Sequence, residues 1–354
     1  MSAINRVFWQ DKVGVPSVIR EGPIPSQVGD GELLIKVRAW AMNPVNAYLQ
    51  TVALPFFRYP SIPGEDVAGT VELVGSAVAA SSKFKVGDRV AGLALGALGG
   101  GGTDRGGFQD FVVLDAAMAY RVPDALSFAE ASVFPLCIAT AAHALFSKDF
   151  LGLPYPQAAA AAPATTGKSV LVWGGASAVG CNAIQMARAA GFEVVTTCSP
   201  RNYEYVRALG ASKAFDYTSP TVVDDVAAEL DGGGACAGIF QAAGPFDAVA
   251  PCCAVAHRSR QDLFVACANA VPGDAVPEGV RARMVLSVDD TRPAYYDTTS
   301  VIFGGFLPEA LASGGYKVAP RPEVVSRAGV DGIQEALDIL REGVSAKKIV
   351  VVDE

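Results

Sequence analysis

Residues 166–191 read TGKSVLVWGGASAVGCNAIQMARAAG and contain the pattern of a strand, a glycine turn and a helix. The apolar run at 170–173 is short and contains β-branched residues, as in a buried parallel strand. Two glycines end that run, and from Val179 onward apolar residues recur at helical spacing until Gly191. Strand, glycine turn and helix form the first unit of a dinucleotide-binding fold, in which the helix N-terminus can receive a pyrophosphate.

The glycine fingerprint of this turn is incomplete. Read as G-x-G-x-x-G, its positions are Gly175, Ser177 and Gly180. Gly175 can make the tight turn, Gly180 can let the helix pack on the strand, and the Ser177 hydroxyl could donate to a phosphate oxygen. An unrelated strand–turn–helix with a glycine-rich turn is the alternative for this segment alone. We expect these three residues, together with Ala178 and Val179, to bind the cofactor.

Length and composition are typical of a compact α/β enzyme with two domains. Of the 354 residues, 51% are hydrophobic and 18% are charged, which disfavours extensive disorder. The net charge of −8 offers no basic field for nucleic acid. No apolar run reaches the length needed to span a bilayer and the start lacks an apolar signal core, so we expect a cytoplasmic protein that does not engage a membrane.

The cysteines and histidines argue against a disulfide framework and against a zinc ribbon. Seven cysteines are scattered without a C-x-x-C pair, and the chain has only two histidines. Most of the cysteines are expected to pack as small hydrophobic residues.

The first 135 residues read as mainly β. Segments 32–38, 66–74 and 108–114 have the composition of strands, and 84–90 carries a Gly-Asp turn between short apolar pieces. Residues 96–107 contain seven glycines and are expected to form a mobile surface loop.

Three motifs in order resemble the medium-chain dehydrogenase/reductase superfamily. They are PGEDVAGTVELVGSAV at 63–78, VGDRVAG at 86–92 and the nucleotide turn itself. The resemblance covers nearly the whole chain. It implies an α/β fold in which a doubly wound Rossmann NADPH-binding domain, 136–304, is inserted in a β-rich GroES-like catalytic and substrate domain, 1–135 plus 305–354.

Zinc members of this superfamily hold the catalytic metal with a cysteine near the position of Asn43 and a histidine in a G-H-E motif. Here Gly64 takes the histidine position, and no cysteine precedes Cys137. A tetrahedral zinc site needs thiolate or imidazole ligands, so we expect no metal.

Metal-free members include quinone reductases, enoyl reductases and the trans-acting enoyl reductases that serve fungal polyketide synthases. The segment NPVNAY at 43–48 resembles their N-P-x-D segment, which implies that Pro44 and Asn46 line the nicotinamide pocket. Tyr48 is a candidate catalytic residue, as hydrogen-bond or proton donor to the substrate carbonyl, or equally a wall residue of an apolar pocket. The resemblance of FPLCIAT at 134–140 makes Thr140 a candidate that contacts the nicotinamide.

The end of the second nucleotide strand, 193–198, decides the cofactor. An NAD enzyme needs a carboxylate there for the ribose hydroxyls, and the sequence continues Ser199-Pro-Arg-Asn202 instead. Ser199, Arg201 and Asn202 suit the 2′-phosphate of NADPH, although Arg201 could also be a solvated surface residue.

The resemblance assigns five further cofactor residues. They are Tyr217 beside the adenosine phosphate, Gly244 in a second glycine turn, Phe264 and Val265 through their backbone to the carboxamide, and Lys347 to a phosphate. A solvated lysine at a turn is the alternative for Lys347. The elements expected in this part are a helix at 203–209, strands at 214–217, 235–240 and 262–267, an extension of the sheet at 281–288, a helix at 330–343 and a strand at 345–352.

The expected reaction is hydride delivery from NADPH to a C=C bond conjugated to a carbonyl, in a small molecule or an acyl thioester. The cluster WGGASAVG…SPRNYEYVRALGA…FDY, with an insertion at 150–166, looks closest to fungal trans-acting enoyl reductases, which implies an acyl carrier protein as partner. A metal-free quinone reductase and a non-catalytic nucleotide-binding subunit are the alternatives. The protein is expected to be a monomer or a homodimer.

Overall fold

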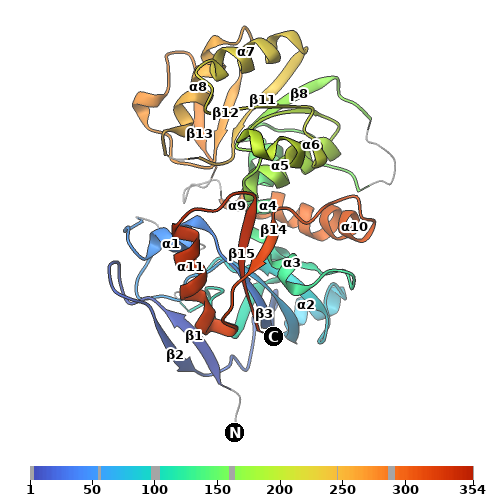
Figure 1. Ribbon diagram of the computed structural model, residues 1–354. Coiled ribbons are helices and arrows are strands. Elements are labelled where there is room, and N and C mark those ends of the chain that lie inside the picture. Colours follow the sequence, from blue (N-terminus) through green and yellow to red (C-terminus); the bar gives the residue numbers. More distant parts are fainter. Residues whose placement is uncertain are drawn as a thin grey trace. The chain divides into compact units, whose positions relative to one another are not determined.

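Two compact units make up the chain in the computed structural model, which describes residues 4–54, 57–96, 104–158, 164–244, 246–285 and 292–353 (Figure 1). The first, here called the β-rich unit, comprises residues 1–136, 303–308 and 321–354. The second, here called the nucleotide unit, comprises residues 137–302 and 309–320. The middle of the expected glycine-rich loop, 97–103, and of the expected insertion, 159–163, lie outside the described residues.

The β-rich unit is built on one seven-stranded sheet. Its elements are β1 (Asn5–Trp9), β2 (Val18–Gly22), β3 (Glu32–Ala41), α1 (Pro44–Leu49), β4 (Asp66–Val74), α2 (Ser76–Ser81), β5 (Arg89–Leu93), β6 (Phe111–Asp115), β7 (Ala119–Arg121), α3 (Phe128–Ser132), β14 (Arg321–Val324), α11 (Ile333–Arg341) and β15 (Lys347–Val352). The strand order is β14-β15-β3-β4-β5-β7, with β6 paired to β3, while β1 and β2 form a separate pair. The last strand of the chain, β15, therefore lies beside β3, which comes from the first part of the chain.

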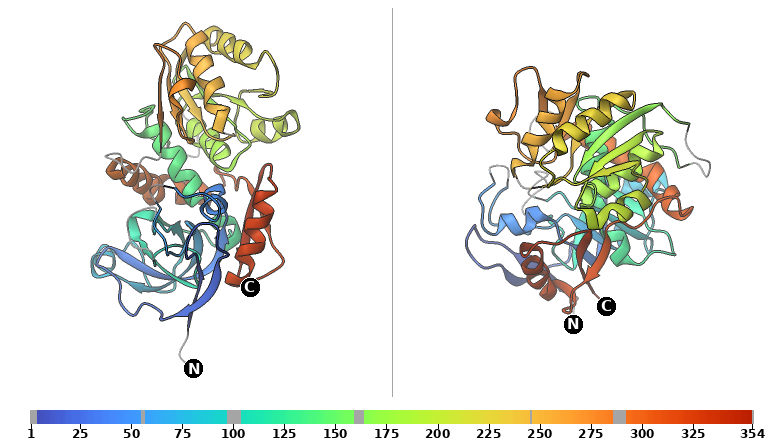
Figure 2. Two further views of the ribbon diagram at one scale, coloured as in Figure 1. Left: turned by 90° about the vertical axis from the view of Figure 1, so that its left-hand side faces the viewer. Right: turned by 45° about the horizontal axis from the view of Figure 1, so that its top comes forward.

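Alternating side chains of β3 form the core of this unit. Leu33, Ile35 and Val37 are 0–1% exposed and belong to one apolar cluster with residues of α11. The apolar face of α11, which includes Ile333 and Leu337, is covered in this way. Figure 2 shows α11 (red) alongside the C-terminal strand in both views.

The nucleotide unit is a doubly wound parallel sheet. Its elements are β8 (Lys168–Trp173), α5 (Ala178–Ala189), β9 (Glu193–Thr197), α6 (Tyr203–Ala208), β10 (Lys213–Phe215), α7 (Val222–Gly232), β11 (Ala235–Gln241), α8 (Val249–Arg258), β12 (Phe264–Cys267), β13 (Arg281–Met284) and α9 (Arg292–Val301), with α4 (Pro135–Phe146) and α10 (Leu307–Ala312) at its limits. The strand order is β10-β9-β8-β11-β12-β13, and every pairing is parallel. Helices α5 and α6 lie on one side of this sheet and α7 and α8 on the other (Figure 1). The order reverses between β8 and β11, which is the switch point where such sheets bind their ligands.

Short turns of other helix types complete the secondary structure. They are 3₁₀ turns at Ala116–Met118, Pro200–Asn202, Phe246–Ala248, Gly273–Ala275 and Gly329–Gly332, and a π-helical turn at Ile302–Phe306.

Several strand boundaries differ from the expectation, and the strand expected at 281–288 ends at Met284. The apolar pieces at 84–90 give a strand only from Arg89, because Gly87 has a φ of 86° and turns the chain, and Val86 is 63% exposed. The strand expected at 108–114 begins at Phe111, and the one expected at 262–267 begins at Phe264.

One stretch, Phe128–Phe146, has the length and apolar composition of a membrane-spanning helix, contrary to the expectation that none would. It comprises α3 and α4, and 78% of its most apolar window is buried inside the protein. Core helices of soluble proteins have the same property.

Candidate functional site

The turn after β8 requires glycine at two close approaches. A Cβ atom on Gly175 would lie 2.1 Å from the Oγ1 atom of Thr196 in β9, and one on Gly180 would lie 2.2 Å from the carbonyl oxygen of Gly174. Any side chain at these positions would therefore displace β9 or lift α5 from the turn. The turn thus fixes where α5 begins, and its first N–H groups suit an anion.

Ser177 is the N-cap residue of α5. Its Oγ accepts a hydrogen bond from the Gly180 N–H at 2.9 Å and donates its own proton to the Gly174 carbonyl at 2.7 Å. The hydroxyl that we expected to donate to a phosphate is therefore engaged within the turn, because capping folds the side chain back onto the helix. The backbone N–H groups of Ala178 and Val179 occupy the first helical positions, where the helix itself supplies no partner.

The parallel register aligns the strand ends at the carboxyl edge of the sheet. Trp173 is paired with Thr197 of β9 on one side and with Gln241 of β11 on the other. Gln241 is in turn paired with Cys267 of β12. The glycine turn and the loops after β9, β11 and β12 therefore leave the sheet at the same level, next to the switch point.

The loop after β9 carries the residues assigned to a 2′-phosphate. The Oγ of Ser199 and the hydroxyl of Tyr217, which is 47% exposed, are 3.3 Å apart. Arg201 is exposed and forms no ion pair with any described residue, and Asn202 is partly buried in the same turn. The fold thus brings Tyr217, from the end of β10, to the loop after β9.

A carboxylate that the sequence analysis did not weigh lies near this loop. Asp216 precedes Tyr217, and burial together with the Asp216 charge raises the pKa of the Cys198 thiol to about 11. One Asp216 oxygen accepts hydrogen bonds from the backbone N–H and the hydroxyl of Thr218, at 2.9 and 2.8 Å. This acid is therefore engaged in its own turn.

The turn after β11 is tied to the loop after β12. The Gly244 carbonyl accepts a hydrogen bond from the Asn269 Nδ2 at 3.1 Å. The Gln241 Oε1 accepts one from the Asn269 backbone N–H, also at 3.1 Å. Gly244 thus lies at the carboxyl edge, as the glycine-turn assignment requires.

The backbone groups of Phe264 and Val265 do not lie at that edge, and this corrects their assignment to the carboxamide. They begin β12 and are paired with residues of the neighbouring strands. Phe264 lies three positions before Cys267, the last residue of the strand, and Val265 lies two positions before it. At about 3.3 Å per residue they lie roughly 7 to 10 Å below the strand ends. The residues that reach the edge after β12 are Ala268 and Asn269.

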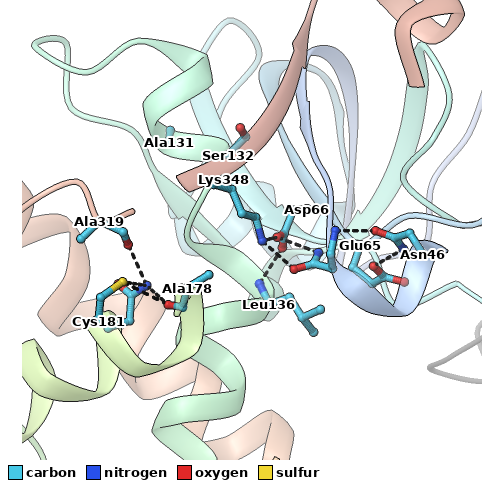
Figure 3. A network of polar contacts seen from close by, with 12 residues as sticks. Asn46, Glu65, Asp66, Ala131, Ser132, Leu136, Ala178, Cys181, Ala319 and Lys348 are labelled. Carbon is cyan, nitrogen blue, oxygen red and sulfur yellow. Dashed lines mark hydrogen bonds and ion pairs between the residues drawn. The ribbon is translucent and has the colours of Figure 1, made fainter. Parts of the chain in front are cut away.

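A buried ion pair anchors the polar centre of the β-rich unit. The Lys348 Nζ of β15 lies 2.9 Å from the Asp66 Oδ2 of β4, and the two side chains are 4% and 0% exposed (Figure 3). Lys348 also donates to the Asn43 Oδ1 at 2.6 Å, and the Asn43 Nδ2 donates to the Asp66 Oδ2 at 2.9 Å. The other Asp66 oxygen accepts from the Leu136 N–H at 2.6 Å. The pair joins the last strand to the N-cap of α1.

A second carboxyl group lies next to this pair. Glu65 is 1% exposed, and its Oε2 accepts a hydrogen bond from the Asn46 Nδ2 at 2.7 Å. Burial raises the pKa of the Glu65 carboxyl to about 7; the Asn46 hydrogen bond opposes the rise, Asp66 adds to it, and Lys348 opposes it. The Asn46 Oδ1 in turn accepts from the Asn43 N–H at 2.8 Å. Asn46 therefore points into the unit as part of this buried network.

The positions where zinc relatives carry ligands are used differently here. Asn43 is bonded to Asp66 and Lys348. At Gly64, with a φ of 97°, an added Cβ would lie 2.2 Å from a ring carbon of Phe108, so no histidine fits. Within the described residues, no three His, Cys, Asp or Glu side chains come together in a group that could hold a metal.

The remaining candidates are distributed as follows. Pro44 and Tyr48 are exposed on α1, Tyr48 to 47%. Thr140 is buried on α4 in the nucleotide unit. Lys347 is exposed and forms an ion pair with Glu323 of β14.

Sequence reasoning missed two features of these sites. It weighed Lys347 and overlooked Lys348, although the alternation of a strand places adjacent residues on opposite faces and could have separated the two. It also passed over Glu65 and Asp66, the acidic pair inside the PGEDVAG motif. Two adjacent acids at the start of a largely buried strand are the signal that could have indicated a buried partner cation.

Comparison with protein families finds two matches along the chain. Residues 29–124 match the family described as alcohol dehydrogenase GroES-like domain, and residues 178–267 match the family described as zinc-binding dehydrogenase. The first match lies in the β-rich unit and the second in the nucleotide unit. The predicted fold class is thereby confirmed.

Full-length relatives are also found. A dehydrogenase of Aspergillus niger is 41% identical over 94% of both chains. A trans-enoyl reductase of Aspergillus japonicus is 38% identical over 99% of this chain and 98% of that protein. Among solved structures, an alcohol dehydrogenase superfamily protein from Novosphingobium aromaticivorans is 27% identical, has a TM-score of 0.74, and covers 99% of this chain and 100% of its own.

Proposed function

This chain belongs to the medium-chain dehydrogenase/reductase family and is an oxidoreductase, and we propose that it delivers hydride from NADPH to the activated C=C bond of an enoyl thioester or enone. The observation that carries the proposal is the likeness to a protein named as a trans-enoyl reductase, which extends over 99% of the chain. The nucleotide unit would bind the cofactor, and the β-rich unit would supply the substrate pocket.

The nucleotide unit fits a phosphorylated dinucleotide. The glycine turn presents the start of α5, with Ala178 and Val179, to a pyrophosphate. Ser199, Arg201 and Tyr217 would bind the 2′-phosphate, since the Ser199 and Tyr217 hydroxyls lie 3.3 Å apart and Arg201, in the same loop as Ser199, is exposed and has no ion pair with a described residue. When bound, the reduced nicotinamide supplies the hydride.

The β-rich unit would hold and polarise the substrate. Tyr48 lies on α1 and is 47% exposed, and its hydroxyl could donate a hydrogen bond to a carbonyl oxygen, while the buried Asn43 and Asn46 fix the start of that helix. Because Gly64 leaves no room for a histidine, the carbonyl would be polarised by hydrogen-bond donors instead of by a zinc ion. Thr140 and Lys347 remain candidates for the nicotinamide and for a phosphate.

If the substrate is an acyl thioester, the proposal also implies a partner protein that carries it. A trans-acting enoyl reductase would take its acyl thioester from the acyl carrier protein of a polyketide synthase. We propose a cytoplasmic protein, monomeric or homodimeric, for this role.

A spectrophotometric screen tests the proposed reaction. NADPH oxidation is followed at one wavelength with an enoyl thioester, an enone and a quinone, and we expect the enoyl thioester to give the highest kcat/KM. Turnover of the quinone alone would instead make the protein a quinone reductase. Cofactor titration should show tighter binding of NADPH than of NADH, and the reverse order would contradict the assignment of Arg201.

A further inference from the structure

Gln241 ends β11 directly beside the switch point and is fully buried, with 0% of its side chain exposed. Its Nε2 has no hydrogen-bond partner among the residues that the structure describes. A buried amide donor without an acceptor is costly in a folded protein, and the large majority of buried side-chain polar atoms are paired. The position therefore calls for an acceptor that the described part of the chain does not provide.

The direction of the amide follows from its other atom. The Gln241 Oε1 accepts from the Asn269 backbone N–H at 3.1 Å, so exchanging the two amide atoms would place two donors against each other. Asn269 lies beyond the end of β12, and its own side chain is bonded to the Gly244 carbonyl. The Gln241 amide group therefore lies at the carboxyl edge, between the ends of β11 and β12.

The position of Gln241 along the sheet indicates which half of a bound dinucleotide would lie near it. The residues proposed for the adenosine phosphate, Ser199 and Tyr217, follow β9 and β10. Gln241 lies on β11, across β8 from them and two strands from β9, which is about 10 Å at a strand spacing of roughly 4.8 Å. In a dinucleotide whose adenosine phosphate lay at Ser199 and Tyr217, the other half, with its phosphate, ribose hydroxyl and carboxamide acceptors, would extend toward Gln241.

We propose that Gln241 is a cofactor-binding residue, whose Nε2 donates a hydrogen bond to an acceptor on the nicotinamide-nucleotide half of the dinucleotide. This inference rests on the proposed function, because it needs a bound pyridine dinucleotide. Gln241 would act as a pre-oriented donor: Asn269 holds the amide in place before the cofactor arrives.

Binding calorimetry with two probes tests the proposal. NADPH carries both halves of the cofactor, and 2′,5′-ADP carries only the adenosine half. We expect Gln241→Met to weaken NADPH binding about tenfold, since one hydrogen bond contributes roughly 1 kcal/mol or more, and to leave 2′,5′-ADP binding unchanged. Gln241→Glu keeps an acceptor for Asn269 but removes the donor, so it should weaken NADPH binding further. It replaces Gln241→Met in the test if the Met variant does not fold.

Thermal unfolding of the ligand-free protein supplies a readout that is independent of activity. Gln241→Met removes an unpaired donor and one accepted bond, so the Tm should change by no more than about 2 °C. The matched control is Gln261→Met at the opposite edge of the sheet, because the Gln261 amide is bonded through both atoms, to Leu230, Gly234 and Cys236. That variant should lose several degrees and keep its affinity for NADPH.

The outcomes separate this inference from the proposed function. Wild-type protein that binds neither NADPH nor 2′,5′-ADP would overturn both. If the wild type binds NADPH and Gln241→Met binds it equally well, a trapped water satisfies the amide and the inference fails alone. Equal losses for NADPH and 2′,5′-ADP would indicate general damage to the site and would also overturn it.

Discussion

Replacing Glu65 by glutamine should make the β-rich unit less sensitive to rising pH. The folded protein raises the pKa of Glu65 from the ordinary 4.5 to about 7, first through burial and then through the neighbouring Asp66. A folded-state pKa above the unfolded value means that the folded form holds the proton more tightly. The stability that this provides is complete below about pH 4.5 and is lost as pH rises through about 7.

The size of the effect follows from the two pKa values. Each unit of difference corresponds to about 1.4 kcal/mol, so full ionisation of Glu65 costs the folded state roughly 3 kcal/mol. About 1.4 kcal/mol of this is already lost at pH 5.5, which leaves about 2 kcal/mol to be lost between pH 5.5 and 8.5. Glutamine keeps an acceptor for the Asn46 amide but cannot ionise, so Glu65→Gln should lack this loss.

Urea unfolding followed by tryptophan fluorescence measures this difference. Trp9 and Trp40 report on the β-rich unit, and Trp173 in the nucleotide unit is replaced by phenylalanine in every sample. We expect the free energy of unfolding of Glu65→Gln, relative to its parent, to rise by about 2 kcal/mol from pH 5.5 to 8.5. Glu72→Gln, at an exposed position of β4, is the matched control and should show no such change.

A constant difference between Glu65→Gln and its parent, within about 0.5 kcal/mol across this pH range, would refute the reasoning. It would mean that Glu65 ionises in the folded protein as it does in water, because Lys348 and the two asparagines cancel the rise in its pKa that burial causes. A pH-dependent change of equal size in Glu72→Gln would show that the effect does not come from the buried network.

The other predictions concern the lysine pair, the glycine turn and the exposed tyrosine. Lys348→Met should lower the free energy of unfolding by about 3 to 5 kcal/mol, because it leaves Asp66 buried without its cation. Lys347→Met removes only an exposed ion pair and should lower it by at most about 1 kcal/mol. Urea unfolding of the two variants measures both changes. Gly180→Ala should weaken 2′,5′-ADP binding at least tenfold, because its Cβ cannot fit against Gly174 without moving the start of α5, and calorimetry that showed unchanged binding would contradict this. Tyr48→Phe should leave the Tm within about 2 °C because the side chain is 47% exposed, and should lower kcat with an enoyl thioester if the hydroxyl donates to the carbonyl; an unchanged kcat would identify Tyr48 as a wall residue.

The buried network gives Asn43, one of the two positions where the family resemblance would put a zinc ligand, a different partner. The Lys348 ammonium bonds both Asn43 and Asp66. The lysine comes from the last strand, which the sheet brings beside β3. A fixed cation of the chain itself therefore holds the polar centre of the β-rich unit together.

Local sequence was sufficient for the first unit of the nucleotide sheet, and the resemblance of three motifs to a known family implied the rest of the architecture. The apolar run, the glycine turn and the helical spacing at 166–191 determine the first strand–turn–helix, because strand and helix periods are properties of neighbouring residues. The structural roles of Gly175 and Gly180 could likewise be predicted from the sequence, since only a residue without a side chain permits the contacts seen in the turn.

Only the tertiary structure decided which side chains meet. It paired Lys348 with Asp66 across most of the length of the chain, engaged the Ser177 hydroxyl within its own turn, and placed Phe264 below the strand ends while Asn269 reaches them. Contacts of this kind depend on strand register and on packing between distant segments, and no local pattern of residues encodes either. The sequence therefore determined what the elements are, and the folded sheet determined which of their polar groups find a partner.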